Sequence, residues 1–306
     1  HLPGPPRRRL VNRQHCVDAD TLSISTRVLR RSKMAGMKPY PLTSDHIAFY
    51  REHGYVQLDA VLTAEELDHA RKAMDAVLAA REKHMHYAEK DDYGRIFLQM
   101  VNLWRVDPGI KQYTLNPRIA EIARRLLGCD KIRLWHDHAL VKMPGDSRAT
   151  PWHQDLPYWP MNEDGTSLSC WMALDDVDET NGCMSFVPGS HKLGRLEPIS
   201  LTDPQDIFSL PEAAGVALAQ ARPMVMKAGS CTFHDGRTFH YAGANNSGRP
   251  RRAMVTIYMA DGTTYSGKRH IVTDPLELAV GDPLEGELFP VLADGTAEQE
   301  GDLLGI

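Results

Sequence analysis

The segment PWHQDLPYWP carries the residue types in this chain that are best suited to chemistry. It places His153 and Asp155 one residue apart. On an extended strand alternate side chains project from the same face, so we expect the imidazole and the carboxylate to point the same way. Two histidines and one carboxylate make up the facial triad that binds Fe(II) and leaves coordination positions open. The pair therefore predicts two of the three protein ligands of a non-haem iron site.

The third ligand must come from a distant strand, and His240 is the preferred candidate. The nearest alternative is His234, which Asp235 follows. His240 is favoured because Arg251 follows it on the next predicted strand, and an arginine can pair in a bidentate manner with a carboxylate. That carboxylate would be the far end of 2-oxoglutarate, whose keto acid end would occupy the open iron positions. Arg252 should alternate to the opposite face and point away.

Composition excludes several classes of protein. The chain has 306 residues, with 35 Lys plus Arg against 40 Asp plus Glu. Five cysteines are scattered without a CxxC pair, which argues against a disulfide framework or a thiolate zinc site and favours a cytoplasmic setting. No apolar stretch approaches the roughly 20 residues of a membrane-spanning helix. Basic residues concentrate near the N-terminus and leave an acidic body, so we expect neither a nucleic acid nor a membrane as a partner.

The basic N-terminal segment, residues 1–36, has several prolines and no sustained periodicity. We interpret it as a disordered or non-native extension, with translation beginning at Met34 or Met37. An Arg-rich transit peptide is the alternative. Residues 37–306 are then expected to form a single domain.

Two helices are well marked in the sequence. The capping box formed by Thr63 and Glu66 opens the first, and apolar residues recur after it at helical spacing. The second has Asn116 as its cap, Pro117 at its first position and Gly128 as its stop. We expect both helices to support one side of a sheet.

Most of the remaining pattern is typical of short strands separated by Gly, Pro, Asn and Asp. The expected strands are HGYVQL (His53–Leu58) and, from Ile132 onward, IRLWHDHALVKM, LSCWMAL, CMSFVP, MVMKAG, CTFH and RAMVTIYM. The acidic stretch Asp175–Thr180 is expected to be an exposed hairpin turn, and the chain after Asp261 to pack on the sheet in extended form. This order predicts a mainly β fold, a sandwich or barrel with buttressing helices.

Four motifs in order, HQDLPYWP, CWMAL, NGCMSFVPGSHK and the H-x10-R pair of His240 and Arg251, resemble the phytanoyl-CoA dioxygenase family of Fe(II)/2-oxoglutarate oxygenases. The resemblance covers about Asp45 to Ala260. It implies a double-stranded β-helix, a relative of the jelly roll and the cupins, with iron in the barrel mouth. Carried over by residue, it implies iron ligation by His153, Asp155 and His240, an anchor for 2-oxoglutarate at Arg251, and further contributions to that pocket from Trp171 and Gln99.

Two positions bear on how the family pattern applies. Several relatives have a serine where this chain has Ala242, so one hydrogen bond to 2-oxoglutarate is expected to be missing. Halogenating relatives replace the carboxylate ligand with a small residue, whereas this chain keeps Asp155. Oxidation is therefore favoured over halogenation.

We thus expect an enzyme that uses Fe(II), 2-oxoglutarate and O2 to oxidise a C–H bond of a small molecule, with release of succinate and CO2. Hydroxylation is favoured, with desaturation and oxidative ring closure as alternatives, on a secondary metabolite or an acyl- or amino-acid-like substrate. The loops at 81–95 and 157–168 should select that substrate. The chain would act as a monomer or homodimer.

Two other classes of protein would use the same ligands. One is a cupin-like metal-binding protein or isomerase without oxygenase activity, and the other is a Zn(II) hydrolase. The remaining histidine pairs, His136 with His138 and His84 with His86, are interpreted as surface residues or as supporting groups around the site.

Overall fold

The strands of the computed structural model pair into a seven-stranded and a four-stranded antiparallel sheet. The structure describes residues 37–82, 98–145, 148–201 and 206–295, and the predicted extension at 1–36 lies outside them. The larger sheet holds β1 (Tyr55–Leu58), β2 (Leu98–Val101), β3 (Lys131–Lys142), β5 (Ser167–Ala173), β8 (Cys231–Asp235), β10 (Arg251–Ala260) and β11 (Val291–Asp294), and the smaller holds β4 (Thr150–His153), β6 (Met184–Phe186), β7 (Arg222–Pro223) and β9 (His240–Ala242).

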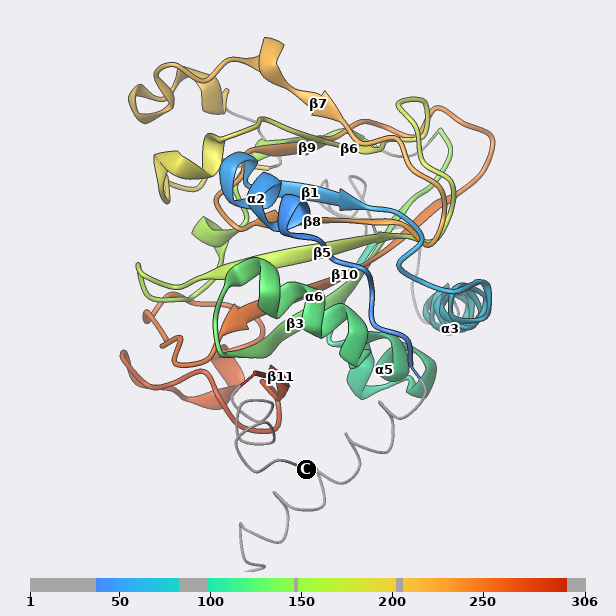
Figure 1. Ribbon diagram of the computed structural model, residues 1–306, viewed down its shortest axis with the longest axis horizontal. Helices are drawn as coiled ribbons and strands as arrows, with labels where there is room; N and C mark the ends of the chain where they lie inside the picture. The colour runs from blue at the N-terminus through green and yellow to red at the C-terminus, as the bar shows by residue number, and fades with distance from the viewer. Residues whose placement is uncertain (1–36, 83–97, 146–147, 202–205, 296–306) are drawn as a thin grey trace, which may run out of the picture. The chain divides into compact units, whose positions relative to one another are not determined.

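The order of the larger sheet is β1-β8-β5-β10-β3-β11, with β2 also paired to β3, and that of the smaller sheet is β4-β9-β6-β7. Strands distant in sequence therefore lie side by side, as Figure 1 shows for β8, β5 and β10. The described residues from Tyr40 onward form one compact unit. The architecture is the double-stranded β-helix that the sequence predicted.

Both faces of the larger sheet are buried, and alternation along each strand divides its side chains between two apolar cores. On β10, Met254 and Tyr258 join the core beneath the helices, whereas Val255 and Ile257 join the core inside the barrel. The barrel core also contains Phe186 of the smaller sheet. The period of two along a strand thus separates a structural face from an inner face that can carry a site.

The helices cover the outer face of the larger sheet. They are α2 (Ser44–His53), α3 (Ala64–Glu82), α5 (Pro108–Thr114) and α6 (Pro117–Leu127), and short 3-10 turns occur at Leu103–Arg105, Leu156–Tyr158, Ser190–Leu193, Ile207–Ser209, Pro211–Ala213, Leu218–Gln220 and Asp274–Leu276. Helix α6 contacts β3, β5 and β10 (Figure 1). The caps of α3 and α6 are as predicted, with reciprocal hydrogen bonds between Thr63 and Glu66 and a left-handed Gly128 at the end of α6.

Several predicted helices and strands differ from those in the structure. The first strand begins at Tyr55, because His53 is the last residue of α2 and Gly54 ends that helix at a φ of 81°. Helices α2 and α5 were not predicted, since both are short and bury few residues on their own. In MVMKAG only Met226 makes a single bridge, to Val177.

Two connections also differ from the prediction. The stretch Asp175–Thr180 joins β5 to β6, which belong to different sheets, so it is a crossover and not a hairpin turn. The chain after Asp261 is mostly irregular, and within its described part only β11 pairs with the larger sheet, along β3. Turn residues indicate where a strand stops, but they carry no information on which sheet the next strand joins.

Asp137 is a buried charged group on the outer face of β3. Its Oδ2 accepts hydrogen bonds from Thr114 Oγ1 at 2.7 Å and from the backbone N–H of Trp104 at 2.9 Å, which ties α5 and the turn before it to the sheet. Its Oδ1 has no partner. Burial raises the pKa of Asp137 to about 6 despite these hydrogen bonds.

We expect this carboxyl group to make the protein less stable as pH rises from about 4 to about 6. The folded pKa lies above the unfolded value of about 3.9, so the folded state binds more protons between the two, and ionisation costs about 3 kcal/mol. Urea unfolding from pH 4 to 8 should therefore show a shallower decline for Asp137→Asn than for the wild type. The exposed Asp68→Asn variant is the control, and equal pH slopes in wild type and Asp137→Asn would contradict the assignment.

Candidate metal centre

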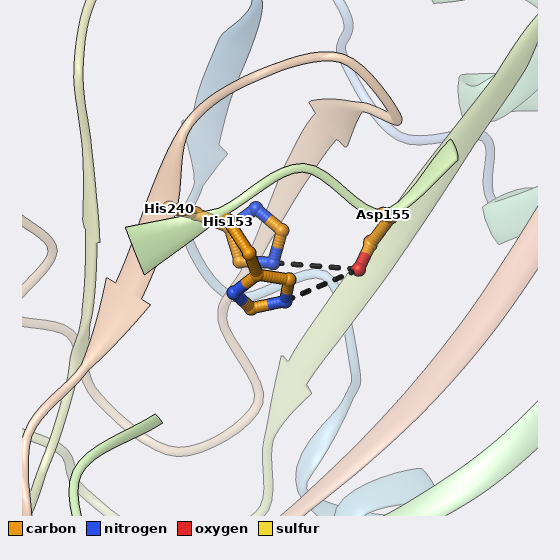
Figure 2. Close-up of side chains that lie close together, drawn as sticks. All are labelled: His153, Asp155 and His240. Carbon is orange, nitrogen blue, oxygen red and sulfur yellow. Dashed lines mark ion pairs between the residues drawn. The ribbon is translucent and has the colours of Figure 1, made fainter. Parts of the chain in front are cut away.

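His153, Asp155 and His240 come together inside the barrel. One possible ligand atom from each residue lies within 4.8 Å of the others. Among the described residues, these three form the group of His, Cys, Asp or Glu side chains that lies close enough together to hold a metal ion. Figure 2 shows both imidazoles directed at the same carboxylate oxygen. The Nε2 atoms of His153 and His240 lie 3.6 and 3.5 Å from Asp155 Oδ1.

Strand pairing brings the two histidines together. β4 pairs with β9, and His153 is directly opposite His240 in that register. The Nδ1 atoms of the two rings lie 2.7 Å from the carbonyl oxygen of Pro151 and 3.0 Å from that of Thr238. A ring that donates from Nδ1 to a carbonyl keeps its Nε2 lone pair for a metal. Burial, together with His240, lowers the pKa of His153, which also favours the neutral imidazole.

Asp155 reaches the cluster by a different route from the one expected. β4 ends at His153, and Asp155 has helical backbone angles, with a φ of −80° and a ψ of −47°, at the start of a 3-10 turn. The prediction that a single extended strand presents both side chains was therefore wrong. A turn after the strand, and not alternation along it, directs the carboxylate toward His153 and His240.

The second oxygen of Asp155 is held by two groups that the sequence analysis did not identify as partners. Ser169 Oγ donates to Oδ2 at 3.0 Å, and His234 Nε2 lies 3.3 Å from the same atom. Burial alone would raise the pKa of Asp155, but the nearby His240 and the contacts with His153 and His234 hold it well below its usual range. The carboxylate is thus ionised, and its Oδ1 faces the Nε2 atoms of His153 and His240.

His234 was the alternative third ligand, and the structure places it beside the other carboxylate oxygen, outside the group of three. Ser169 and His234 are cross-strand partners on β5 and β8. The signal that could have found Ser169 is its spacing, because it lies two residues before Trp171 and so shares its face of the strand.

His136 and His138 were interpreted as surface residues or as supporting groups around the site, and the structure excludes the surface. They are 3% and 8% exposed, because alternation along β3 turns both into the barrel while Asp137 faces the helices. Burial lowers the pKa of His138 to about 4 and that of His136 well below its usual range, so both rings are neutral. His84 and His86, and most of the predicted loop at 81–95, lie outside the described residues.

Arg251 is a buried cation inside the barrel. It is 1% exposed, and its Nε and Nη1 atoms have no hydrogen-bond partner. Its guanidinium carbon lies 5.2 Å from the centre of the Trp171 ring, which is itself buried and has an unpaired Nε1. Burial lowers the pKa of Arg251 to about 10, which leaves it charged at neutral pH. A buried guanidinium with unpaired donors is suited to an anionic ligand.

Arg252 behaves as predicted and points to the opposite face, where it forms ion pairs with Asp175 at 2.7 Å and Asp75 at 2.6 Å. Gln99 lies in β2 opposite Leu140 of β3. Its side chain lies outside the described part of the structure, so its contribution to the pocket stays a prediction.

Comparison with known proteins places this site in a family. The model of the phytanoyl-CoA dioxygenase (PhyH) family matches residues 50–253 of the chain. The chain belongs to the phytanoyl-CoA dioxygenase family. Among curated proteins, ectoine dioxygenase of Bordetella bronchiseptica is 27% identical over 242 residues, covering 71% of this chain and 75% of that protein.

Two solved enzyme structures have a higher sequence identity to this chain than ectoine dioxygenase has. The non-haem, alpha-ketoglutarate-dependent carbocyclase SnoK from nogalamycin biosynthesis is 33% identical, with a TM-score of 0.70, over 83% of this chain and 99% of SnoK. The epimerase SnoN in complex with Fe3+, alpha-ketoglutarate and nogalamycin RO is 30% identical, with a TM-score of 0.64, over 81% of this chain and 97% of SnoN.

This phytanoyl-CoA dioxygenase family member is therefore an oxidoreductase that depends on iron, 2-oxoglutarate and O2. Its own residues fit those groups, since two imidazoles and one carboxylate form a donor set for Fe(II), and Arg251 offers unpaired donors to a carboxylate. Membership favours the oxygenase over the cupin-like binding protein and the zinc hydrolase. The relatives bind small molecules, and no helix in the described part of this chain is long and apolar enough to cross a membrane.

The cluster predicts stabilisation by a divalent metal. We expect anaerobic Fe(II), or Co(II) as a substitute, to raise the unfolding free energy by about 2.7 kcal/mol at a hundred times its Kd. His153→Ala, Asp155→Ala and His240→Ala should each abolish this gain in urea unfolding, whereas His69→Ala on the exposed face of α3 should keep it. Full stabilisation of any of the three cluster variants would remove that residue from the ligand set.

Proposed function

We propose that His153, Asp155 and His240 bind the iron of this oxygenase and that Arg251, packed on Trp171, binds the far carboxylate of 2-oxoglutarate. The observation that carries the proposal is the buried guanidinium of Arg251, whose unpaired donors lie on the same inner face as the group of three. In no described contact does it pair with a carboxylate.

The pairing of β5 with β10 is consistent with the distance that 2-oxoglutarate must span between Asp155 and Arg251. Ser169, which contacts Asp155, is opposite Ile257, and Trp171 is opposite Val255 one step along the same face. Two residues of a strand span about 7 Å, so the Trp171 ring and the guanidinium against it lie one such step beyond the carboxylate ligand. A short dicarboxylic acid with its keto end at the metal would extend along this face toward Arg251.

Iron held by these residues would supply the oxidation, with a 2-oxo acid and O2 as co-substrates. The protein's residues do the rest. Backbone carbonyls fix the tautomers of His153 and His240, and Ser169 with His234 occupies Oδ2 of Asp155, so that Oδ1 alone is directed at the metal. The apolar barrel core, which includes Trp171 and Phe186, excludes water from the reacting centre.

We infer that the substrate is a secondary metabolite oxidised at an aliphatic C–H bond. Support comes from the similarity to SnoK and SnoN, which is higher in identity than that to ectoine dioxygenase. Removal of one hydrogen can end in hydroxylation, epimerisation or ring closure, and the carbocyclase relationship makes ring closure a specific candidate beside hydroxylation. The segment at 157–168, where Trp159 and Met161 pack into the barrel core, would be one boundary of the substrate space.

The first test needs no substrate. Anaerobic titration of the protein with Fe(II) and 2-oxoglutarate should produce the visible charge-transfer band of a keto acid chelated to ferrous iron. His153→Ala should lose the band, and Arg251→Met should raise the Kd of 2-oxoglutarate by about a hundred-fold, because a charge-assisted bidentate pair is lost.

Arg252→Met is the matched control, since it removes a neighbouring guanidinium on the opposite face and should leave the band and its Kd unchanged. A normal Kd for 2-oxoglutarate in Arg251→Met would sink the anchor assignment. Iron binding without any band in the wild type would show that the keto acid does not chelate the metal at this site.

The partners of Asp155 Oδ2 give a separate prediction. Ser169→Ala and His234→Phe should each weaken Co(II) binding about ten-fold or more, because groups that orient a ligand contribute at this level. His234→Gln, which retains an amide donor, should recover part of the loss. Calorimetric titration with Co(II) measures this, and unchanged affinity in both Ser169→Ala and His234→Phe would show that the two contacts do not orient the ligand.

A further inference from the structure

Lys142 is a second buried cation inside the molecule, at the end of β3. Its side chain is 1% exposed. Its Nζ donates to three backbone carbonyls, those of Arg148 at 2.9 Å, Ala242 at 3.0 Å and Gly243 at 2.6 Å. No ion pair joins it to a carboxylate within the described ranges, which is unusual for a lysine at this depth.

The three carbonyls indicate which form of Lys142 the structure holds. An ammonium has three N–H donors, and each one meets an acceptor here. A neutral amine has two donors and would direct its lone pair at the third oxygen. Burial and the nearby charge of Arg251 lower the pKa of Lys142 to about 6, and the complete set of acceptors opposes that shift. The matched geometry supports the ammonium.

The position of Lys142 connects it to both parts of the site. In the β3–β10 register it is directly opposite Arg251, so the two side chains share the inner face of the sheet. Ala242 ends β9, the strand that begins with His240, and Arg148 lies just before β4, the strand that ends with His153. One ammonium thus joins the chain segments that carry the two histidines to the strand pair that carries Arg251.

We propose that Lys142 is a positioning residue for the 2-oxoglutarate pocket. It fixes the ends of β4 and β9 against β3 and β10, and it places a second positive charge beside Arg251. Two cations without an acidic partner make this end of the barrel selective for a 2-oxo acid with a distal carboxylate. This inference rests on the proposed role of Arg251 as the anchor.

The experiment compares two keto acids in the anaerobic optical titration. 2-Oxoglutarate has the distal carboxylate, whereas 2-oxobutyrate has the same chelating end and a neutral tail. Lys142→Met should raise the Kd of 2-oxoglutarate about ten-fold and change that of 2-oxobutyrate less than about two-fold, because only the former is attracted by the lost charge.

The controls separate charge from structure. Lys131→Met removes a lysine at the other end of β3, where it pairs with Asp294 at 3.6 Å, and should leave both Kd values unchanged. If Lys142→Met does not fold, Lys142→Gln takes its place, since a neutral amide can still donate to two of the carbonyls. Equal weakening of both keto acids, or no weakening of either, would overturn the proposal.

Arg251→Met, measured in the same titration, separates the proposed role of Lys142 from the proposed role of Arg251. Selective loss of 2-oxoglutarate in Arg251→Met but not in the Lys142 variant would overturn the role of Lys142 and leave the anchor in place. An unchanged preference in Arg251→Met would instead remove the anchor itself.

Discussion

Enclosing the Asp155 carboxylate, whose side chain is only 22% exposed, is unfavourable unless hydrogen-bonding groups surround it. This requirement involves four strands, because His153 comes from β4, Ser169 from β5, His234 from β8 and His240 from β9. The observed register of the two sheets delivers these groups together, with His153 opposite His240 and Ser169 opposite His234. The metal centre and the fold therefore depend on the same set of contacts.

Charges are separated along the inner face of the larger sheet. Near Ser169 and His234 the interior holds the negative charge of Asp155, and further along the same face the buried basic side chains of Arg251 and Lys142 lie opposite each other. The cost of leaving Arg251 donors unpaired in a buried site is the kind of strain that a bound ligand relieves. The barrel is thus arranged for a cation at one end and an anion at the other, which matches iron and a dicarboxylic co-substrate.

Similarity to SnoK and SnoN over most of the chain shows how a common framework accommodates different outcomes. The framework holds the candidate ligands, while connections such as 157–168 contribute side chains to the barrel core beside them. Ala242 contributes to this framework through its backbone alone. Its methyl side chain cannot donate a hydrogen bond, but its backbone carbonyl accepts one from Lys142.

The sequence by itself determined the features that depend on neighbouring residues. The caps at Thr63 and Asn116, the alternation along β3, β5 and β10, and the opposite directions of Arg251 and Arg252 all follow from local periodicity and hydrogen bonding. The spaced motifs, through their resemblance to a known family, also indicated the fold and the cofactors. Asp155, by contrast, was assigned to the right cluster by an incorrect local argument, because a turn and not a strand orients it.

Only the tertiary structure decided which side chains from distant strands meet. The order β1-β8-β5-β10-β3 places Ser169 beside His234 and Lys142 beside Arg251, and no local pattern encodes such neighbours. The same order turned His136 and His138 inward, where the sequence had left open the surface or a supporting place around the site. The physical reason is that strand pairing is selected by the total burial and charge balance of two closed sheets, which is a property of the whole chain and not of any segment.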